Sequence, residues 1–169
     1  MDFENKPKKK LTPAQALIRA QLSCAYQERC QQEMRNKLYE WGLYSDAVEN
    51  IISDLITTNY LNEERFSKTF AGGKFRIKKW GKIKIKIELK KRNISDYCIK
   101  KAMEEINDKD YIKTLKEIIA KKSHLMGSHS KGGREIKGSK LLGRNYKIAQ
   151  YAASRGFEQD LIWDIIKEE

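Results

Sequence analysis

The chain has 169 residues, with 35 lysines and arginines against 23 aspartates and glutamates, giving a formal net charge of +12. Two prolines argue against a turn-rich all-β sandwich, and the sequence lacks an apolar stretch for a membrane span or secretion signal, which predicts a cytoplasmic protein. The three cysteines (Cys24, Cys30 and Cys98) suit reduced core thiols, while the charge favours nucleic acid, an acidic protein surface or an anionic membrane as partner.

Three segments with helical periodicity each follow a residue that commonly caps a helix N-terminus. In the first, Pro13 also stands at the first helical position, where its fixed φ suits a helix. These segments are 13–26 after Thr12, 63–75 after Asn62 and 109–122 after Asp108. We expect each to open a unit of the fold.

A sequence repeat follows each of these helices. KLYEWGLYSDAVENII (37–52), ELKKRNISDYCIKKAM (88–103) and AASRGFEQDLIWDII (152–166) align without gaps. One position holds Gly42, Asn93 and Gly156, residue types that tolerate a left-handed backbone, so one helix should end there before the next begins. The repeat predicts an all-α fold of three tandem three-helix repeats forming an elongated, curved helical array.

The repeat also sets expected unit boundaries. A basic N-terminal tail (1–10) precedes units at 11–61, 62–106 and 107–169. The third unit is longer than the second, and we place its insertion as a loop near 124–137, where His, Ser and Gly cluster.

The segment KIKIKIEL (82–89) alternates as a half-buried strand would, but its counterparts in the other units read as helical. On a helix, Ile85 and Leu89 form one ridge, while Ile83 and Ile87 form a second on nearly the opposite face. We expect a neighbouring unit to cover the second ridge; the alternative is a contact surface for a binding partner.

Positive charge is concentrated in two blocks, residues 74–92 and 121–147. Such blocks suit phosphate groups or an acidic protein surface, although a charge run is often only a solvated face. We predict a surface that binds nucleic acid or an acidic protein. Its candidate residues are Lys74, Arg76, Lys78, Lys79, Lys82, Lys84, Lys86, Lys90, Lys91, Arg92, Lys131, Arg134, Lys137, Lys140 and Arg144.

Other side chains offer weaker signals. Trp80 could stack on a base, but a tryptophan among lysines more often packs against its own bundle. His124 and His129 lack the additional ligands that a metal site needs, and Arg65 suits a tie between two helices. With no paired carboxylates or nucleophile–base arrangement, we expect no catalytic residue, no cofactor and no metal, hence no enzyme.

Five motifs in order resemble the RecX family of bacterial recombination regulators across nearly all of residues 14–168. They are RCQQEMRNKL (29–38), WGLYSDAVENIISDL (41–55), NYLNEERFSKTF (59–70), WGKIKIKIELKKRNI (80–94) and SRGFEQDLIWDII (154–166). Asn62 stands where the family usually has an acid, and Asn93 replaces the commoner glycine. Both replacements keep the local chemistry of a cap or a left-handed turn.

The resemblance implies a non-enzymatic regulatory protein that binds the RecA recombinase filament. Family members lodge in the groove of the RecA–DNA filament and limit its ATPase and strand-exchange activities, and some contact single- or double-stranded DNA through phosphates. By that resemblance we expect a monomer that acts in DNA recombination, DNA repair and the SOS response. The alternative is a stand-alone helical DNA- or RNA-binding protein with no recombinase partner; a hydrolase or nuclease has only the basic surface in its favour.

Overall fold

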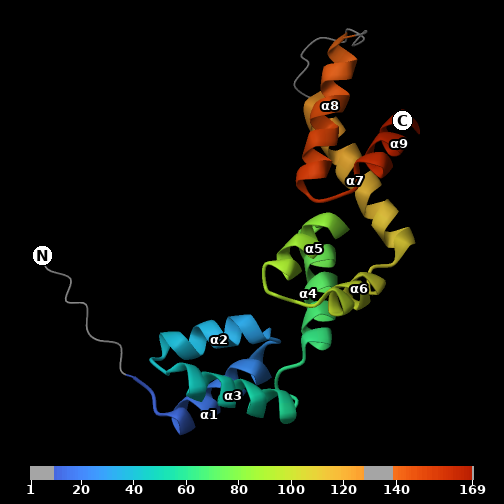
Figure 1. Cartoon of the computed structure of the whole chain (residues 1–169). Helices are drawn as coiled ribbons and strands as arrows, with labels where there is room; N and C mark the ends of the chain where they lie inside the picture. Colours follow the sequence, from blue (N-terminus) through green and yellow to red (C-terminus); the bar gives the residue numbers. More distant parts are fainter. Residues whose placement is uncertain (1–9, 128–138, 169) are drawn as a thin grey trace, which may run out of the picture.

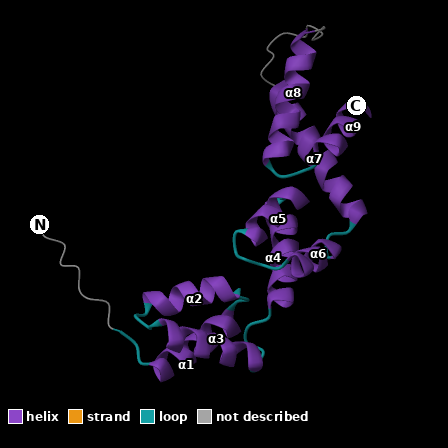
Figure 2. Cartoon of the chain, in the orientation of Figure 1, coloured by secondary structure: helices purple, strands orange, loops and turns teal. Residues whose placement is uncertain are grey.

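The computed structural model describes residues 10–127 and 139–168, which form nine helices and no strand (Figures 1 and 2). The all-α fold class predicted from the repeat is confirmed. The helices are α1 (Pro13–Tyr26), α2 (Gln31–Glu40), α3 (Ser45–Thr57), α4 (Glu63–Lys78), α5 (Lys82–Lys90), α6 (Asp96–Glu104), α7 (Asp108–Gly127), α8 (Ser139–Ser154) and α9 (Gln159–Glu168).

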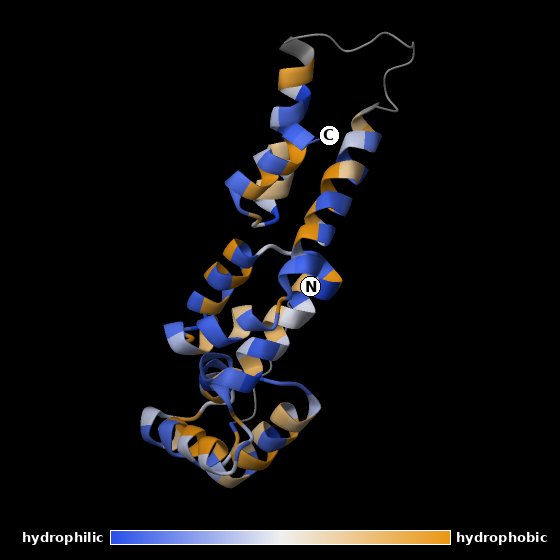
Figure 3. Cartoon of the chain, turned by 90° about the vertical axis from the view of Figure 1, so that its right-hand side faces the viewer, coloured by the Kyte–Doolittle hydropathy of each residue, from blue (hydrophilic) through white to orange (hydrophobic). Residues whose placement is uncertain are grey.

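The helices form three groups of three along an elongated body (Figure 1). The first unit (α1–α3) lies at one end, the second (α4–α6) in the middle and the third (α7–α9) at the other end. Figure 3 shows hydrophobic and hydrophilic residues alternating along the helices, as expected where one face of each helix packs in a core. Among the described residues, no helix is long and apolar enough to cross a membrane.

The helix starts follow the predicted capping chemistry in two of three cases. Thr12 and Gln15 form a reciprocal capping box at α1, and the Asn62 side chain accepts a hydrogen bond from the N–H of Arg65 at α4. The predicted cap Asp108 is wrong, since it is the first residue of α7. Asn107 takes the capping role instead, because its Oδ1 accepts from the N–H of Lys109 at 2.9 Å.

The repeated turn position adopts the predicted left-handed conformation in all three units. Gly42, Asn93 and Gly156 have φ angles of +84°, +56° and +90°. After each turn the chain starts the third helix of its unit, so these positions set the angle between the second and third helices.

The predicted loop near 124–137 is wrong in its first part. Helix α7 continues through Gly127, and α8 already begins at Ser139. Much of the extra length of the third unit therefore lengthens two neighbouring helices. The remainder of the predicted insertion, including His129, lies outside the described residues.

The buried residues form two cores rather than three. The first unit has its own cluster, built around Met34, Leu38 and Leu55. A second cluster runs continuously through the second and third units, from Leu89 to Phe157, and takes in Cys30 from the start of α2. The second and third units are therefore joined by apolar packing, whereas the first unit joins the second with few apolar contacts.

The second and third units meet where the turn after α8 lies on the start of α5. The N–H groups of Gly81 and Ile83 donate to the carbonyl oxygens of Arg155 and Gly156, at 2.8 and 3.0 Å. These donors have no partner within their own helix, because they belong to its first turn. A side chain at Gly81 or Gly156 would collide with the other unit, so the close approach requires glycine at both positions.

The first and second units meet in a related way. Asn93 corresponds to Gly156 in the repeat, and its amide donates to Oε1 of Gln32 at 2.9 Å, at the start of α2. Beside it, Arg92 pairs with Glu33 at 3.1 Å. Side chains thus make at the first junction the contacts that the main chain makes at the second.

Candidate functional site

Two lysines of the predicted binding surface hold the second and third units together. Lys82 pairs with Asp108 at 2.7 Å, and its ammonium lies 4.8 Å from the ring centroid of Tyr111. Lys84 donates to the carbonyl oxygen of Ser154 at 3.3 Å. Because both side chains are engaged in the fold, they are poor candidates for a partner contact.

The end of α5 carries a second group of engaged cations. Arg92 bonds to Glu88 at 3.0 Å as well as to Glu33, and Lys91 bonds to Glu88 at 2.9 Å. These hydrogen bonds from Lys91 and Arg92 hold the pKa of Glu88 below its usual range. The geometry gives Arg92 a structural role at the first junction.

Four predicted cations are exposed and have no partner for their charged group among the described residues. They are Arg76, Lys78, Lys79 and Lys86. Lys90 is nearly as free, because its ion pair with Asp96 is long, at 3.5 Å, and joins two exposed side chains. The free positive charge among these predicted residues therefore lies at the end of α4 and along the exposed side of α5.

The exposed side of α5 is also apolar. Ile85 and Leu89 are fully buried, as the first ridge predicts, but Ile83 and Ile87 are 43% and 49% exposed. The expectation that a neighbouring unit covers the second ridge is therefore wrong: the main-chain hydrogen bonds from the third unit reach α5 only at its start, and Ile83 and Ile87 stay exposed. The other interpretation, a contact surface for a partner, fits this geometry.

We call this surface the outer face of α5 and define it by Ile83, Lys86, Ile87 and Lys90, which are spaced at i, i+3, i+4 and i+7. Two apolar side chains in line with two ammonium groups suit a partner that offers both apolar surface and carboxylates or phosphates. A purely solvated charge run would not need the isoleucines.

The second basic block is described only in part. The guanidinium of Arg144 donates to the carbonyl oxygen and to Oγ of Ser123, the latter at 2.6 Å, so it ties α8 to α7. Lys140 lies in α8, but nothing is described of its side chain. Lys131, Arg134 and Lys137 lie outside the described residues, and their binding role stays a prediction.

Trp80 lies against the core shared by the second and third units, with the ammonium groups of Lys74 and Lys84 at 5.1 and 4.9 Å from its ring. This packing agrees with the interpretation of Trp80 as a bundle residue. Arg65, as expected, ties elements together, because its guanidinium pairs with Glu28 at 2.6 Å and donates to the carbonyl oxygens of Asn59 and Tyr60.

The cysteines and the described histidine form no shared site. Cys24, Cys30 and Cys98 are free and buried, and burial raises the pKa of the Cys24 and Cys30 thiols. In residues 10–127 and 139–168, no three His, Cys, Asp or Glu side chains gather as metal ligands would.

The helical periodicity of residues 109–122 places Tyr111 on the apolar stripe of that helix, but it indicates neither the role of its hydroxyl nor that of Glu158. The Tyr111 hydroxyl accepts a hydrogen bond from the N–H of Lys82 at 2.9 Å and donates to Oε2 of Glu158 at 2.6 Å. Burial, together with Glu158, raises the pKa of this phenol, which keeps it protonated as a donor. Tyr111 corresponds to Phe66 when the caps Asn62 and Asn107 are aligned. The hydroxyl group that Tyr111 adds at this repeat position is the sequence feature that could have indicated its hydrogen-bonding role.

Comparison with known proteins gives one consistent family. Residues 62–103 match the family described as "RecX, second three-helix domain". Proteins called "Regulatory protein RecX" are similar along the chain: that of Lactobacillus johnsonii is 28% identical over 92% of this chain and 54% of its own length. The protein of Clostridium acetobutylicum is 27% identical over 83% of this chain and 62% of its own length. The protein of Prosthecochloris aestuarii is 25% identical over 90% of this chain and 92% of its own length.

Solved structures share the fold. The crystal structure of RecX from Lactobacillus salivarius has a TM-score of 0.75, with 22% identity over 92% of this chain and 95% of that one. A second crystal structure, of a regulatory protein RecX, has a TM-score of 0.74, with 17% identity over 93% and 74%. The chain spans between half and two thirds of the first two curated relatives named above. The second unit thus matches the second three-helix domain of RecX, most of the chain is similar in sequence to regulatory proteins called RecX, and its fold is shared with two solved RecX structures.

Proposed function

We propose that this protein is a non-enzymatic regulator that binds the RecA recombinase filament and lowers its ATPase and strand-exchange activities, and so acts in recombination and DNA repair. The relatives named as regulatory proteins support a regulatory role. The observation that carries the proposal is the outer face of α5, an exposed amphipathic basic surface on the middle unit that no described part of the chain covers.

The mechanism that we propose is binding at several points. An elongated body places its three units side by side along a line, and each unit can contact a successive RecA protomer or DNA phosphates (Figure 1). Contacts that are weak one by one add through effective concentration when they are held on one body. The units proposed for this role are 11–61, 62–106 and 107–169, and we propose that the protein acts as a monomer.

RecA ATPase on single-stranded DNA tests the proposal, measured with increasing amounts of the protein. The informative variant is K86E/K90E, which reverses both charges of the outer face. Lys82 is left intact, because its loss would also disturb the junction with the third unit. A matched control, K109E/K113E, makes the same charge change at exposed positions of α7.

We expect inhibition by the unchanged protein and the control, and a loss of inhibition by at least about tenfold in concentration for K86E/K90E, the size expected when charge pairs worth about 1.4 kcal/mol are lost. No change in ATPase at stoichiometric amounts of the unchanged protein would refute the proposal.

A stand-alone DNA- or RNA-binding role is the second candidate, and the free cations Arg76, Lys78, Lys79 and Lys86 favour it. Binding through phosphates would fall steeply with salt. Such binding by the unchanged protein, without any effect on RecA, would replace the first proposal with this one.

A further inference from the structure

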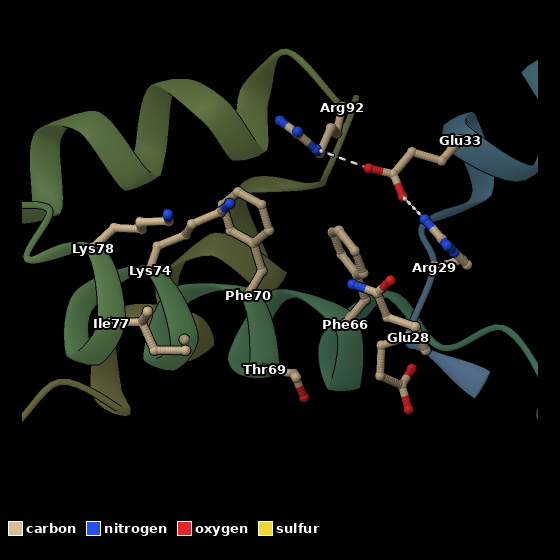
Figure 4. Close-up of a pocket in the computed structure, with 12 residues that line it drawn as sticks. Glu28, Arg29, Glu33, Phe66, Thr69, Phe70, Lys74, Ile77, Lys78 and Arg92 are labelled. Carbon is tan, nitrogen blue, oxygen red and sulfur yellow. Dashed lines mark hydrogen bonds and ion pairs between the residues drawn. The ribbon is translucent and has the colours of Figure 1, made fainter. Parts of the chain in front are cut away.

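A groove of about 400 Å³ lies where the first unit meets the second (Figure 4). One side is the face of α4 that carries Phe66, Phe70, Gly73 and Ile77, and the other is the connection between α1 and α2. The groove shares no residue with the outer face of α5. It is therefore a separate candidate site.

Apolar surface runs along the α4 side of the groove. Phe66 and Phe70 have ring centroids 5.7 Å apart, with Phe70 only half-buried. Two helical turns beyond Phe70, Ile77 is 77% exposed, and a Cβ at Gly73 would meet no atom within 4 Å. The groove thus has open space next to apolar side chains, which is what a large apolar group of a ligand needs.

Cations line the same side of the groove. The ammonium of Lys74 and the guanidinium of Arg92 lie 5.1 and 4.9 Å from the centroid of the Phe70 ring. Lys78, one turn beyond Lys74, has no partner for its ammonium among the residues described. In Figure 4, Lys74 and Lys78 lie on the same side of α4, so a ligand seated over Phe70 would have both ammonium groups within reach.

The other junction shows why this groove is open. Arg29 precedes the N-cap of α2, as Trp80 precedes the N-cap of α5 at the corresponding repeat position. Trp80 packs its indole against the core of its junction. Arg29 does not close the first junction in this way, and its buried Nε has no hydrogen-bond partner among the described atoms. An aromatic side chain is thus present at one junction and missing at the other.

The charges at the two ends of the groove favour an acidic peptide over a nucleic acid as its ligand. Glu28 and Glu33 stand on the first-unit side, paired with Arg65 and Arg92. The second carboxylate oxygen of Glu28 is buried without a hydrogen-bond partner among the described atoms. A nucleic-acid backbone would bring phosphates toward these carboxylates as well as toward the lysines. A short peptide can place its carboxylates at the lysine end alone.

We propose that the groove binds a peptide segment of a partner protein that carries one large aromatic side chain next to acidic residues. The aromatic side chain enters the space beside Phe70 and Gly73, and the acidic residues meet Lys74 and Lys78. The segment would rest on both units, so its binding would also fix the first unit relative to the second. This inference goes beyond the proposed filament contact, since it assigns a second ligand to a different surface.

Fluorescence anisotropy on the full chain tests the inference. The probe is a short labelled synthetic peptide with one tryptophan between pairs of glutamates. Control peptides replace the tryptophan with serine or the glutamates with lysines. The protein variant G73W fills the groove from inside, and G73A is its matched control, because both change the same helical position and only tryptophan occupies the space. I77D, at an exposed position, provides a second variant that leaves the core untouched.

We expect the acidic tryptophan peptide to bind at least about tenfold more tightly than either control peptide, a difference of about 1.4 kcal/mol. G73W and I77D should weaken its binding by at least the same factor, while G73A should change it by less than about twofold. Circular dichroism melting of each variant confirms that the fold is retained.

Three results would overturn the inference: no binding of the peptide at millimolar concentration, binding that G73W and I77D both leave unchanged, or tighter, G73W-sensitive binding of an oligothymidylate probe. The last would make the groove a nucleic-acid site. Two results separate this site from the proposed function. G73W should lose peptide binding but still inhibit RecA, and K86E/K90E should lose RecA inhibition but still bind the peptide.

Discussion

Tyr111→Phe tests whether the junction between the second and third units depends on one hydroxyl. The substitution keeps the ring, whose centroid lies 5.8 Å from Phe75 and 5.0 Å from Phe157. It removes the bond from the Lys82 N–H and the bond to the Glu158 carboxylate. A bond to a neutral group contributes about 1 kcal/mol and one to a charged group about 1.5–3 kcal/mol, so we expect a loss of about 2–3 kcal/mol after partial hydration of Glu158.

Urea unfolding of single-tryptophan proteins measures this loss unit by unit. Trp41 reports on the first unit, and Trp163, on α9, reports on the core shared by the second and third. The loss should appear in the Trp163 transition and be small in the Trp41 transition. Tyr97→Phe, which removes an exposed hydroxyl, is the control and should leave both transitions unchanged. A Tyr111→Phe loss below about 0.5 kcal/mol, or equal shifts for both tryptophans, would refute this account of the junction.

Three further predictions concern stability. Gly73→Ala should raise the free energy of unfolding by about 0.5–1 kcal/mol in urea titrations, because glycine weakens a helix interior and the new methyl group meets open space; a destabilised variant would contradict the open groove. Lys79→Gly should also stabilise, by up to about 1 kcal/mol, since Lys79 has a φ of +54°, and Lys78→Gly inside α4 is the destabilising control. Acidification should lower the melting temperature below about pH 4.5, because hydrogen bonds from Lys91 and Arg92 lower the folded-state pKa of Glu88, and one from Arg35 lowers that of Glu49. The stabilisation by these carboxylates is full above their unfolded-state pKa and is lost as the pH falls through the folded-state value, so a melting temperature constant down to pH 3 would contradict it.

Local chemistry could be predicted from the sequence with good accuracy. Thr12 and Asn62 cap their helices, and Gly42, Asn93 and Gly156 turn the chain with positive φ, because these effects depend on a residue and its near neighbours. The structure of the insertion in the third unit was harder to predict from the sequence. Its Ser- and Gly-containing sequence indicated a loop from residue 124, but packing of α7 against α8 extends the helix to Gly127.

The candidate site depended on contacts that local patterns do not contain. The alternation in 82–89 identified both ridges of α5, but only the position of the third unit decides that Ile83 and Ile87 stay exposed. In the same way, equal spacing made Lys82 and Lys86 look alike. Asp108 and Tyr111, far along the chain, engage the first and leave the second free.

The early start of α8 makes the third unit differ from the second at the place where the second unit receives its neighbour. The following unit docks at the start of α2 through the side chain of Gln32 and at the start of α5 through the N–H groups of Gly81 and Ile83. The repeat puts the equivalent of Ile83 at Tyr146. Since α8 begins at Ser139, Tyr146 lies in the helix interior, where its N–H is already bonded to the preceding turn. Free main-chain donors like those at the start of α5 are therefore not available at the corresponding place on α8.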